Sequence, residues 1–180
     1  MTKARSNTKI AGNDKAQNGQ LDTPVVAFTR HDHRRCRRST MNAVVSLCAT
    51  RQLRLTPARQ RTLEILLESH IALGAYEVLE KLAASGFGEK PPQVYRALGF
   101  LIEQGFAHKI ERLNAYIACA APQVCSQPCF MVCAQCGRVA EQSVPKASKQ
   151  LAAAANQLGF SPIASVIEIS GLCHQCEVHS

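Results

Sequence analysis

Cys133-Ala134-Gln135-Cys136-Gly137 and Cys173-His174-Gln175-Cys176 are two Cys-x-x-Cys pairs in the last third of the chain. A two-residue spacer lets one tight turn present two sulfurs, and the glycine after the first pair lets the backbone bend towards them. Two such turns supply the four thiolates of a tetrahedral zinc site, whereas structural or redox disulfides are the alternative. Because 36 residues separate the pairs, a shared metal would join two distant parts of one domain.

The residues after the first pair argue against a thiol-disulfide enzyme. In thioredoxin-type proteins the Cys-x-x-Cys lies between a strand and a helix. Here it leads into Gly137-Arg138-Val139-Ala140-Glu141, a run typical of the return strand of a metal knuckle. The pattern therefore favours a metal-binding protein without enzyme activity.

The composition is that of a globular protein with room for one or two domains. Of the 180 residues, 46% are hydrophobic and 19% are charged, and no run resembles a membrane span. Residues 1–30 are polar, so we expect no signal peptide and a cytoplasmic location. The nine cysteines would then be reduced, which favours metal ligation over disulfides.

Positive charge is concentrated in the first third of the chain. Residues 1–61 contain 13 Lys and Arg against 3 Asp and Glu, whereas residues 62–180 contain 8 against 10. A basic part before a near-neutral, cysteine-rich part indicates a polyanionic partner, such as double-stranded DNA, for one end of the molecule. A basic disordered tail with no partner is the alternative.

Residues 1–38 lack hydrophobic periodicity, and we expect a disordered basic N-terminal tail there. Three residues near its end, His31, His33 and Cys36, are of metal-ligand types. Because arginines flank them and oppose a cation, this stretch is interpreted as a basic arm.

Helical spacing begins near Ser39 and is expected in four segments. The later three begin at Thr56-Pro57, Gly74 and Pro91-Pro92. The fourth carries an apolar stripe at the helical repeat, formed by Val94, Ala97, Leu98, Leu101 and Ile102. Its opposite face offers Gln93, Tyr95, Arg96, Gly99 and Phe100.

Two strands, at 106–111 and 115–119, follow the fourth helix as a hairpin. Helices followed by such a hairpin form a winged helix-turn-helix, whose last helix enters the major groove. We assign this DNA-binding domain to residues 39–119. Aromatic and arginine side chains suit contacts with thymine methyl groups, guanine and phosphate. The candidate DNA contacts are Arg59, Tyr76, Gln93, Tyr95 and Arg96.

A linker at residues 120–129 is expected to lead into a small α/β domain at residues 130–180. Its strands are predicted at 130–132, 139–141 and 165–169, with an alanine-rich helix at 146–158. The fold class is therefore α+β. Val166 or Ile169, if exposed, would suit a sheet shared by two copies of the chain in a homodimer.

Several motifs together resemble the ferric uptake regulator (Fur) family and, within it, the zinc uptake regulator branch. They span about residues 40–176 and are Arg54-Leu55-Thr56-Pro57-x-Arg59, Pro91-Pro92-Gln93-Val94-Tyr95-Arg96-Ala97-Leu98, Gln104-Gly105-Phe106-Ala107-His108-Lys109 and the two cysteine pairs. The resemblance implies a cytosolic homodimer that binds operator DNA when its regulatory metal site is loaded. It would then repress zinc-uptake genes.

The resemblance also implies two zinc sites per chain. The structural site would use the two cysteine pairs, namely Cys133, Cys136, Cys173 and Cys176. The regulatory site of that branch uses a wing histidine, a cysteine ending the wing, a linker histidine and a glutamate after the first knuckle. Three of these four match His108, Cys119 and Glu141.

The chain departs from the family pattern at the linker ligand, because residues 120–132 contain no histidine. Cys125 is the first choice for the missing ligand and Cys129 the second. Gln93 and Gly99 also depart from the family pattern, which affects operator detail. A redox or peroxide switch would share the fold, but the His108, Cys119 and Glu141 set favours a metal sensor.

Overall fold

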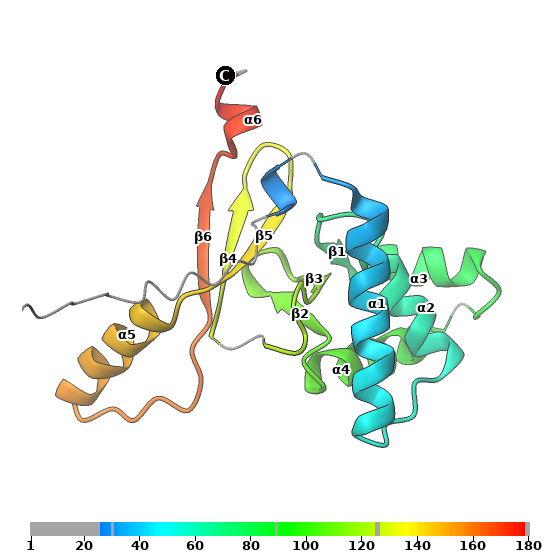
Figure 1. Cartoon of the computed structure of the whole chain (residues 1–180), viewed down its shortest axis with the longest axis horizontal. Coiled ribbons are helices and arrows are strands. Elements are labelled where there is room, and N and C mark those ends of the chain that lie inside the picture. Colours follow the sequence, from blue (N-terminus) through cyan, green and yellow to red (C-terminus); the bar gives the residue numbers. More distant parts are fainter. Residues whose placement is uncertain (1–25, 30, 89, 125–126, 179–180) are drawn as a thin grey trace, which may run out of the picture.

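The chain folds into two parts that meet along an apolar seam, as the computed structural model shows (Figure 1). The structure describes residues 26–29, 31–88, 90–124 and 127–178. Within these residues the N-terminal part combines helices with one three-stranded sheet, and the C-terminal part is built on a second. This architecture confirms the predicted α+β class.

Four helices form the body of the N-terminal part. They are α1 (His33–Thr50), α2 (Pro57–Leu66), α3 (Ala75–Ala84) and α4 (Pro91–Glu103). The predicted cap of α2 is present, because the Thr56 hydroxyl accepts a hydrogen bond from the Arg59 N–H at 3.4 Å. Among the described residues, every helix is too short or too polar to cross a membrane.

The start of α1 differs from the sequence expectation. The helix begins at His33 instead of near Ser39, so residues 33–38 do not belong to a disordered tail. The physical reason is the Asp32 side chain, which accepts hydrogen bonds from the N–H groups of Arg34 and Arg35 at 3.0 and 3.4 Å. Residues 1–25 lie outside the described residues, so a disordered tail there stays a prediction.

The inner face of α4 is rotated slightly from the predicted stripe. Phe100, expected on the polar face, is buried, whereas Ile102 is exposed. The ring of Phe100 lies edge to face with the ring of Phe106, their centroids 6.3 Å apart. Phe106 begins the wing and is fully buried, and it turns this edge of α4 inwards.

The wing is the predicted hairpin with one additional strand. Strands β2 (Ala107–Ile110) and β3 (Ala115–Ala118) are antiparallel, and η2 (Glu111–Leu113) joins them. Strand β1 (Leu73–Gly74) pairs with the other edge of β3. A strand of two residues is too short to show an alternation of apolar and polar residues, so the sequence did not predict β1.

The C-terminal sheet has the strand order β5-β4-β6. Its strands are β4 (Pro128–Cys133), β5 (Val139–Ser143) and β6 (Ile167–Gly171). β4 begins at Pro128, so the linker ends earlier than the predicted residue 129. β6 is parallel to β4 and runs beyond the predicted 165–169 as far as Gly171. Helix α5 (Pro145–Gln157) precedes β6, and the short helix α6 (His174–Glu177) follows it.

The seam between the two parts is a small hydrophobic core of its own. Ile110 and Ile117 of the wing are buried against Phe130, Val132 and Val139 of the C-terminal sheet. Burial of side chains contributed by both parts favours the relative orientation seen in Figure 1.

Hydrogen bonds reinforce the seam at two places. The Glu168 carboxylate of β6 accepts from the N–H groups of Glu111 and Arg112, at 2.7 and 3.2 Å. The carbonyl oxygen of His70, after α2, accepts from the N–H of Val139 at 2.8 Å. Groups placed at this seam can therefore affect the angle between the two parts.

Candidate metal centres and nucleic-acid interface

Four cysteine sulfurs gather at one end of the C-terminal sheet. The sulfur atoms of Cys133, Cys136, Cys173 and Cys176 all lie within 4.8 Å of one another. β4 ends at Cys133, and the parallel strand β6 leads directly to Cys173. Gly137 closes the first knuckle, because its φ of +70° suits glycine and its N–H donates to the Cys133 carbonyl at 3.0 Å.

The donor atoms of this group fit a tetrahedral zinc ion. The sulfurs of Cys136 and Cys173 lie 3.8 Å apart, and a zinc–sulfur tetrahedron with bonds of about 2.3 Å has an edge of about 3.8 Å. Backbone N–H groups of Cys136 and Cys173 lower the pKa of Cys133 to about 6. Burial and the neighbouring thiols raise the pKa of Cys176 to about 12. A dication allows all four sulfurs to be thiolates together.

His108, Cys119 and Glu141 form a second group, which spans the seam. His108 lies on β2, Cys119 follows β3 and Glu141 lies on β5. The Cys119 thiol donates to the Glu141 carboxylate at 3.5 Å, and the same oxygen lies 3.3 Å from Nε2 of His108. The second carboxylate oxygen accepts from the Ala120 N–H at 2.8 Å.

The chemistry of this second group also suits zinc. An imidazole, a thiol and a carboxylate within 4.8 Å of one another are the ligand types that Zn²⁺ accepts. Cys119 is buried, and the side chains of His108 and Glu141 are 17% and 10% exposed. The group therefore brings together three of the four residues predicted for the regulatory site.

Of the two candidates for the fourth regulatory ligand, the structure describes only one. Cys125 lies outside the described residues. Cys129 is buried on β4 opposite Gln142, whereas Phe130 lies opposite Glu141. Because neighbouring residues of a strand point to opposite faces, Cys129 faces away from Glu141 and its partners.

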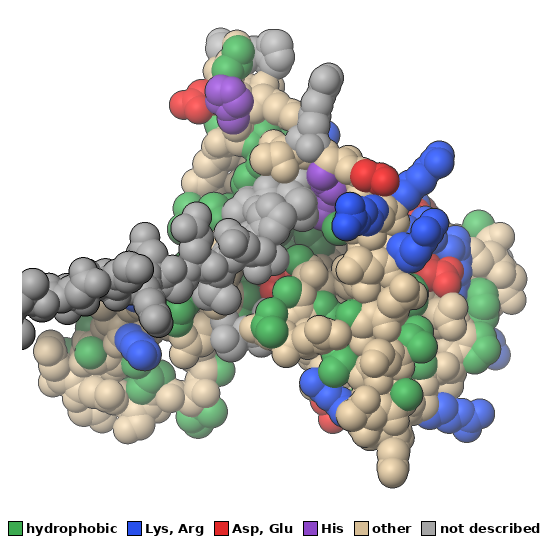
Figure 2. Space-filling view, in the orientation of Figure 1, with side chains coloured by type: hydrophobic (Ala, Val, Ile, Leu, Met, Phe, Trp, Pro, Cys, Tyr) green, Lys and Arg blue, Asp and Glu red, His purple; other side chains and the backbone are tan. Residues whose placement is uncertain are grey.

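The exposed face of α4 carries the predicted DNA contacts. Tyr95 and Arg96 are exposed, and Gln93 is partly exposed. Tyr76, at the start of α3, is 71% exposed. The N-terminal ends of α2 and α4 border a shallow groove lined by Thr56, Ala58, Arg59, Lys90, Pro92, Gln93, Arg96 and Ala97. Figure 2 shows Lys and Arg side chains mainly over this helical part of the molecule.

Arg59 is held in place at the edge of that groove. Its guanidinium lies 3.7 Å from the centroid of the Phe100 ring and donates to the Arg54 carbonyl at 2.6 Å. The stacking explains part of the burial of Phe100. It also gives the Arg59 guanidinium a fixed position next to the exposed face of α4.

Comparisons with known proteins identify the family to which this chain belongs. The model of the ferric uptake regulator family matches residues 50–170. The chain belongs to the ferric uptake regulator family. A zinc uptake regulation protein of Escherichia coli (strain K12) is 38% identical to it over 131 residues, which are 72% of this chain and 77% of that protein.

Two solved structures of this family share the fold. One is a zinc uptake regulator complexed with zinc and DNA, 35% identical, with a TM-score of 0.73 over 79% of this chain and 97% of that one. The other is the crystal structure of holo XcZur, 38% identical, with a TM-score of 0.72 over 78% and 98%. The structural similarity confirms the predicted fold class, in which an N-terminal winged-helix domain is followed by the C-terminal domain of this family.

A third group of ligand types in this Fur-family chain was not predicted as a site. His31, His33, Cys36 and His70 place one ligand atom each within 4.8 Å of one another. Burial, followed by the nearby His33, His31 and Arg138, lowers the pKa of His70 to about 4, so this ring is neutral at pH 7.

Residues 33–38 belong to α1, so this stretch is helical instead of disordered, and its role as a basic arm stays a prediction. The signal was the spacing of His33 and Cys36 with Thr40 and Val44, which together follow one helical face. Spacing could not connect His70 to these residues, because it follows Cys36 by 34 positions and the two histidines by more. The three earlier residues also precede the part that the family model matches.

Proposed function

We propose that the protein is a zinc-responsive, dimeric transcriptional repressor that binds operator DNA when its regulatory site is loaded and so controls zinc-uptake genes. The observation that carries this proposal is the group of His108, Cys119 and Glu141 across the seam. The relatives named above as zinc uptake regulators, one of them complexed with zinc and DNA, support it.

The mechanism follows from the position of this group. Two winged-helix domains of a dimer read two half-sites, and their recognition helices must be separated by about one helical turn of DNA, roughly 34–36 Å. Zinc bound by His108 and Cys119 on one side and by Glu141 on the other would supply a bond across the seam. Conformations with the correct separation then become more populated, which raises affinity for the operator.

The site at the cysteine pairs has a structural role in this proposal. One zinc would be held by the four sulfurs of Cys133, Cys136, Cys173 and Cys176 and would fix the end of the C-terminal sheet, and the regulatory group would hold a second. Thiolate and imidazole ligands favour zinc over oxygen-loving ions such as Mg²⁺.

Surfaces of the C-terminal part support a homodimer. α5 has one buried residue, Ser148, so the described part of the chain leaves most of this helix uncovered. β6 is an edge strand, and Val166 and Ile169 are 59% and 52% exposed. Leu151 and Phe160 add exposed apolar area nearby. A second copy of the chain would cover these surfaces and pair with the sheet edge.

Replacing Tyr95 or Arg96 with alanine should weaken specific operator binding. If each side chain contacts a base, the loss is about 1–3 kcal/mol in binding free energy. Zinc content should not change, because neither residue belongs to a ligand group. The affinity of each variant for operator and random duplexes, measured at one salt concentration, checks this.

Lys149→Ala is the matched control, because it removes one exposed positive charge from α5, well away from α4 (Figure 1). Arg96→Ala should reduce the preference for operator over random DNA, and Lys149→Ala should leave that preference unchanged. If Arg96→Ala and Tyr95→Ala retain the parent affinity and preference, α4 is not the reading helix.

The two linker cysteines offer a direct test of the fourth ligand. Cys125→Ser should abolish the zinc response of DNA binding, because the regulatory set would fall from four ligands to three. Cys129→Ser should respond as the parent does, since its side chain lies on the other face of the sheet. One zinc titration of both variants decides between them, and the reverse pattern would place Cys129 in the site.

A further inference from the structure

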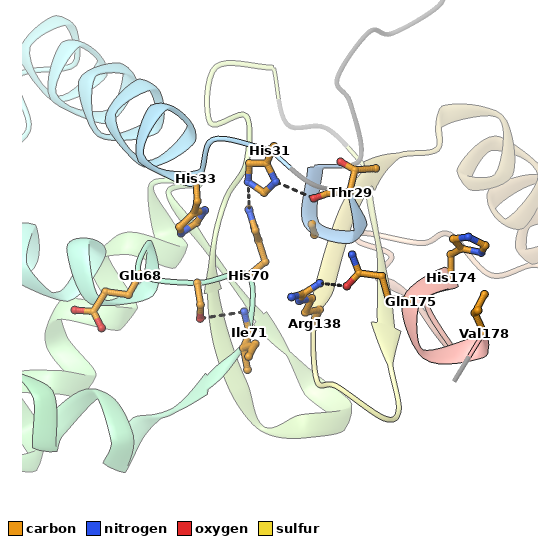
Figure 3. A pocket seen from close by; sticks show the side chains of 12 residues that line it. Thr29, His31, His33, Glu68, His70, Ile71, Arg138, His174, Gln175 and Val178 are labelled. Carbon is orange, nitrogen blue, oxygen red and sulfur yellow. Dashed lines mark hydrogen bonds between the residues drawn. The ribbon is translucent and has the colours of Figure 1, made fainter. Parts of the chain in front are cut away.

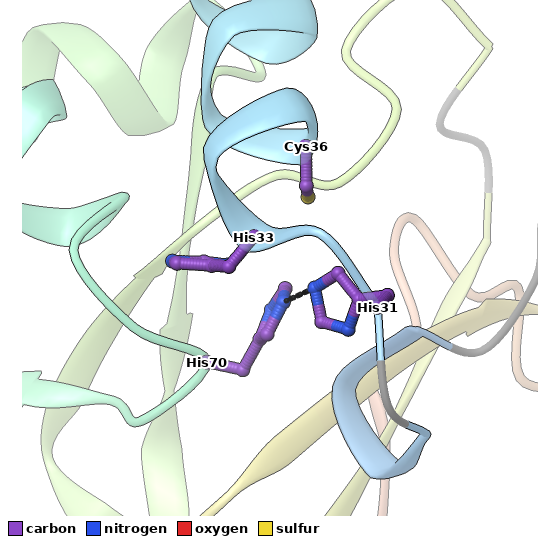
Figure 4. A group of neighbouring side chains, drawn as sticks. All are labelled: His31, His33, Cys36 and His70. Carbon is purple, nitrogen blue, oxygen red and sulfur yellow. Dashed lines mark hydrogen bonds between the residues drawn. The ribbon is translucent and has the colours of Figure 1, made fainter.

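Three histidines and one cysteine converge at the start of α1, apart from both zinc sites described above (Figure 4). His31 precedes the helix, His33 and Cys36 lie in its first turns, and His70 lies in the segment after α2. Side chains from two segments of the chain thus meet at one point. Four such ligand atoms within 4.8 Å of one another are the number and types that a tetrahedral zinc ion requires.

Two of the imidazoles are already oriented as metal ligands. Nε2 of His33 donates to the Leu67 carbonyl at 3.0 Å, so Nδ1 carries the lone pair. This Nδ1 is buried and has no hydrogen-bond partner within the described part of the chain. Nδ1 of His31 donates to the Thr29 carbonyl at 3.1 Å, which leaves its Nε2 with the lone pair. Backbone carbonyls that fix the second nitrogen are typical of ligating histidines.

The third imidazole lies at a ligand's distance from the first. Nε2 of His70 is 3.1 Å from Nε2 of His31 and donates a hydrogen bond to it when His31 Nδ1 donates to Thr29. Two nitrogens on a zinc tetrahedron with bonds of about 2.0–2.1 Å lie about 3.3 Å apart. An ion can therefore take the place of that hydrogen bond after a small movement, while the proton of His70 moves to Nδ1.

The arginines nearby do not prevent this. His33 and Cys36 lie on the face of α1 that continues into buried residues, whereas Arg34, Arg35 and Arg38 are exposed on other faces. Arg37 and Arg138 are half-buried, and the Arg138 guanidinium donates to the Gln175 side chain at 2.7 Å instead of pointing only at the imidazoles. The guanidinium of an exposed arginine is solvated and its charge is screened within about 10 Å at 0.1 M salt.

We propose that His31, His33, Cys36 and His70 form a third binding site for Zn²⁺ or a similar divalent transition metal. Binding is simple ligand exchange. The Cys36 thiol releases its proton, the ion gains one thiolate and three neutral imidazoles, and no oxidant or reductant is needed. The three nitrogens and one sulfur favour zinc over Mg²⁺ or Ca²⁺. A hollow lined in part by His31, His33 and His70 gives the ion a path from solvent (Figure 3).

The position of the site gives it a structural consequence. His70 accepts the backbone hydrogen bond from Val139 of β5, and its neighbour Ile71 forms a bridge with Arg138. An ion shared by α1 and His70 therefore attaches the first helix of the DNA-binding part to the seam. Occupancy of this site would hold residues 31–36 close to the C-terminal sheet.

The test counts zinc on the full-length protein without DNA, so its result is independent of the proposed repressor function. In a Cys119→Ser background, which removes a thiolate from the regulatory site, a chromophoric chelator titration should show one exchangeable zinc besides the structural one. Adding His33→Ala or His70→Ala should lower the affinity for that zinc by more than about 100-fold. Losing even a residue that only hydrogen-bonds to a ligand lowers metal affinity roughly ten- to a hundredfold.

Cobalt supplies a second readout. Co²⁺ at the exchangeable site should show a thiolate charge-transfer band that Cys36→Ser removes. His33→Gln retains an N–H that can reach Leu67 but offers no imidazole, so it separates loss of a ligand from loss of fold. Glu68→Gln is the control, because Glu68 borders the same hollow and is of a metal-ligand type, but it belongs to none of the three ligand groups. The proposal is overturned if His33→Gln and His70→Ala bind zinc as tightly as the Cys119→Ser parent, or if Glu68→Gln weakens binding equally.

Discussion

Cys133→Ser should unfold the C-terminal part or convert the dimer to monomers. Zinc at the four-cysteine group contributes folding free energy directly, on the order of 10 kcal/mol in small zinc domains. Cys133 ends β4 and its sulfur accepts from the Cys173 N–H, so its loss disconnects the two knuckles. The measurements are zinc content, circular dichroism and molecular mass in solution.

Cys129→Ser is the matched control, since Cys129 is a buried thiol on the same strand that belongs to no ligand group among the described residues. It should keep its structural zinc and its mass, with a loss of stability of about 1–3 kcal/mol for burying a hydroxyl. A folded, dimeric Cys133→Ser protein without that zinc would contradict the structural assignment.

His108→Ala and Cys119→Ser should each abolish zinc-dependent DNA binding and leave the dimer intact. Either change takes one ligand from the group that spans the seam, so the proposed regulatory set falls from four ligands to three and holds zinc too weakly to join the two parts. The proposed structural zinc would be held by four other residues and should be retained. DNA affinity is measured with and without added zinc, together with mass and tightly bound zinc.

The control for this pair is Gln142→Ala. Gln142 follows Glu141 on β5 and points to the other face of the sheet, so the variant should respond to zinc as the parent does. Full zinc response in both His108→Ala and Cys119→Ser would remove this group from the mechanism. Loss of dimerisation in either variant would show a structural role instead of a regulatory one.

Much of the fold could be predicted because its elements carry strong local signals. Thr56-Pro57 and Pro91-Pro92 begin helices where expected, and both strands of the wing hairpin lie where apolar residues flank the turn at 111–114. The four cysteines could be grouped because a Cys-x-x-Cys turn presents both sulfurs to one point. Family resemblance supplied the grouping of His108, Cys119 and Glu141, which no spacing rule connects.

The errors arose where a single residue or a distant contact determines the structure. Asp32 moves the start of α1 forward to His33, although the residues that follow it are mostly charged. Packing against Phe106 turns Phe100 inwards, and periodicity alone could not distinguish the two edges of the stripe. His70 joins the N-terminal histidines only in three dimensions, so the sequence could not show a third ligand group.

The central claim is that zinc at the seam controls recognition of DNA. Its most direct test is a zinc titration of DNA binding at fixed salt, with a duplex that the protein selects from a random pool and a scrambled duplex as control. We expect affinity for the selected duplex to rise with zinc by about 5- to 150-fold, the range of typical allosteric couplings, while affinity for the scrambled duplex changes little. Equal affinity for the selected duplex in zinc-loaded and chelator-treated protein, with the structural zinc still bound, would contradict the account.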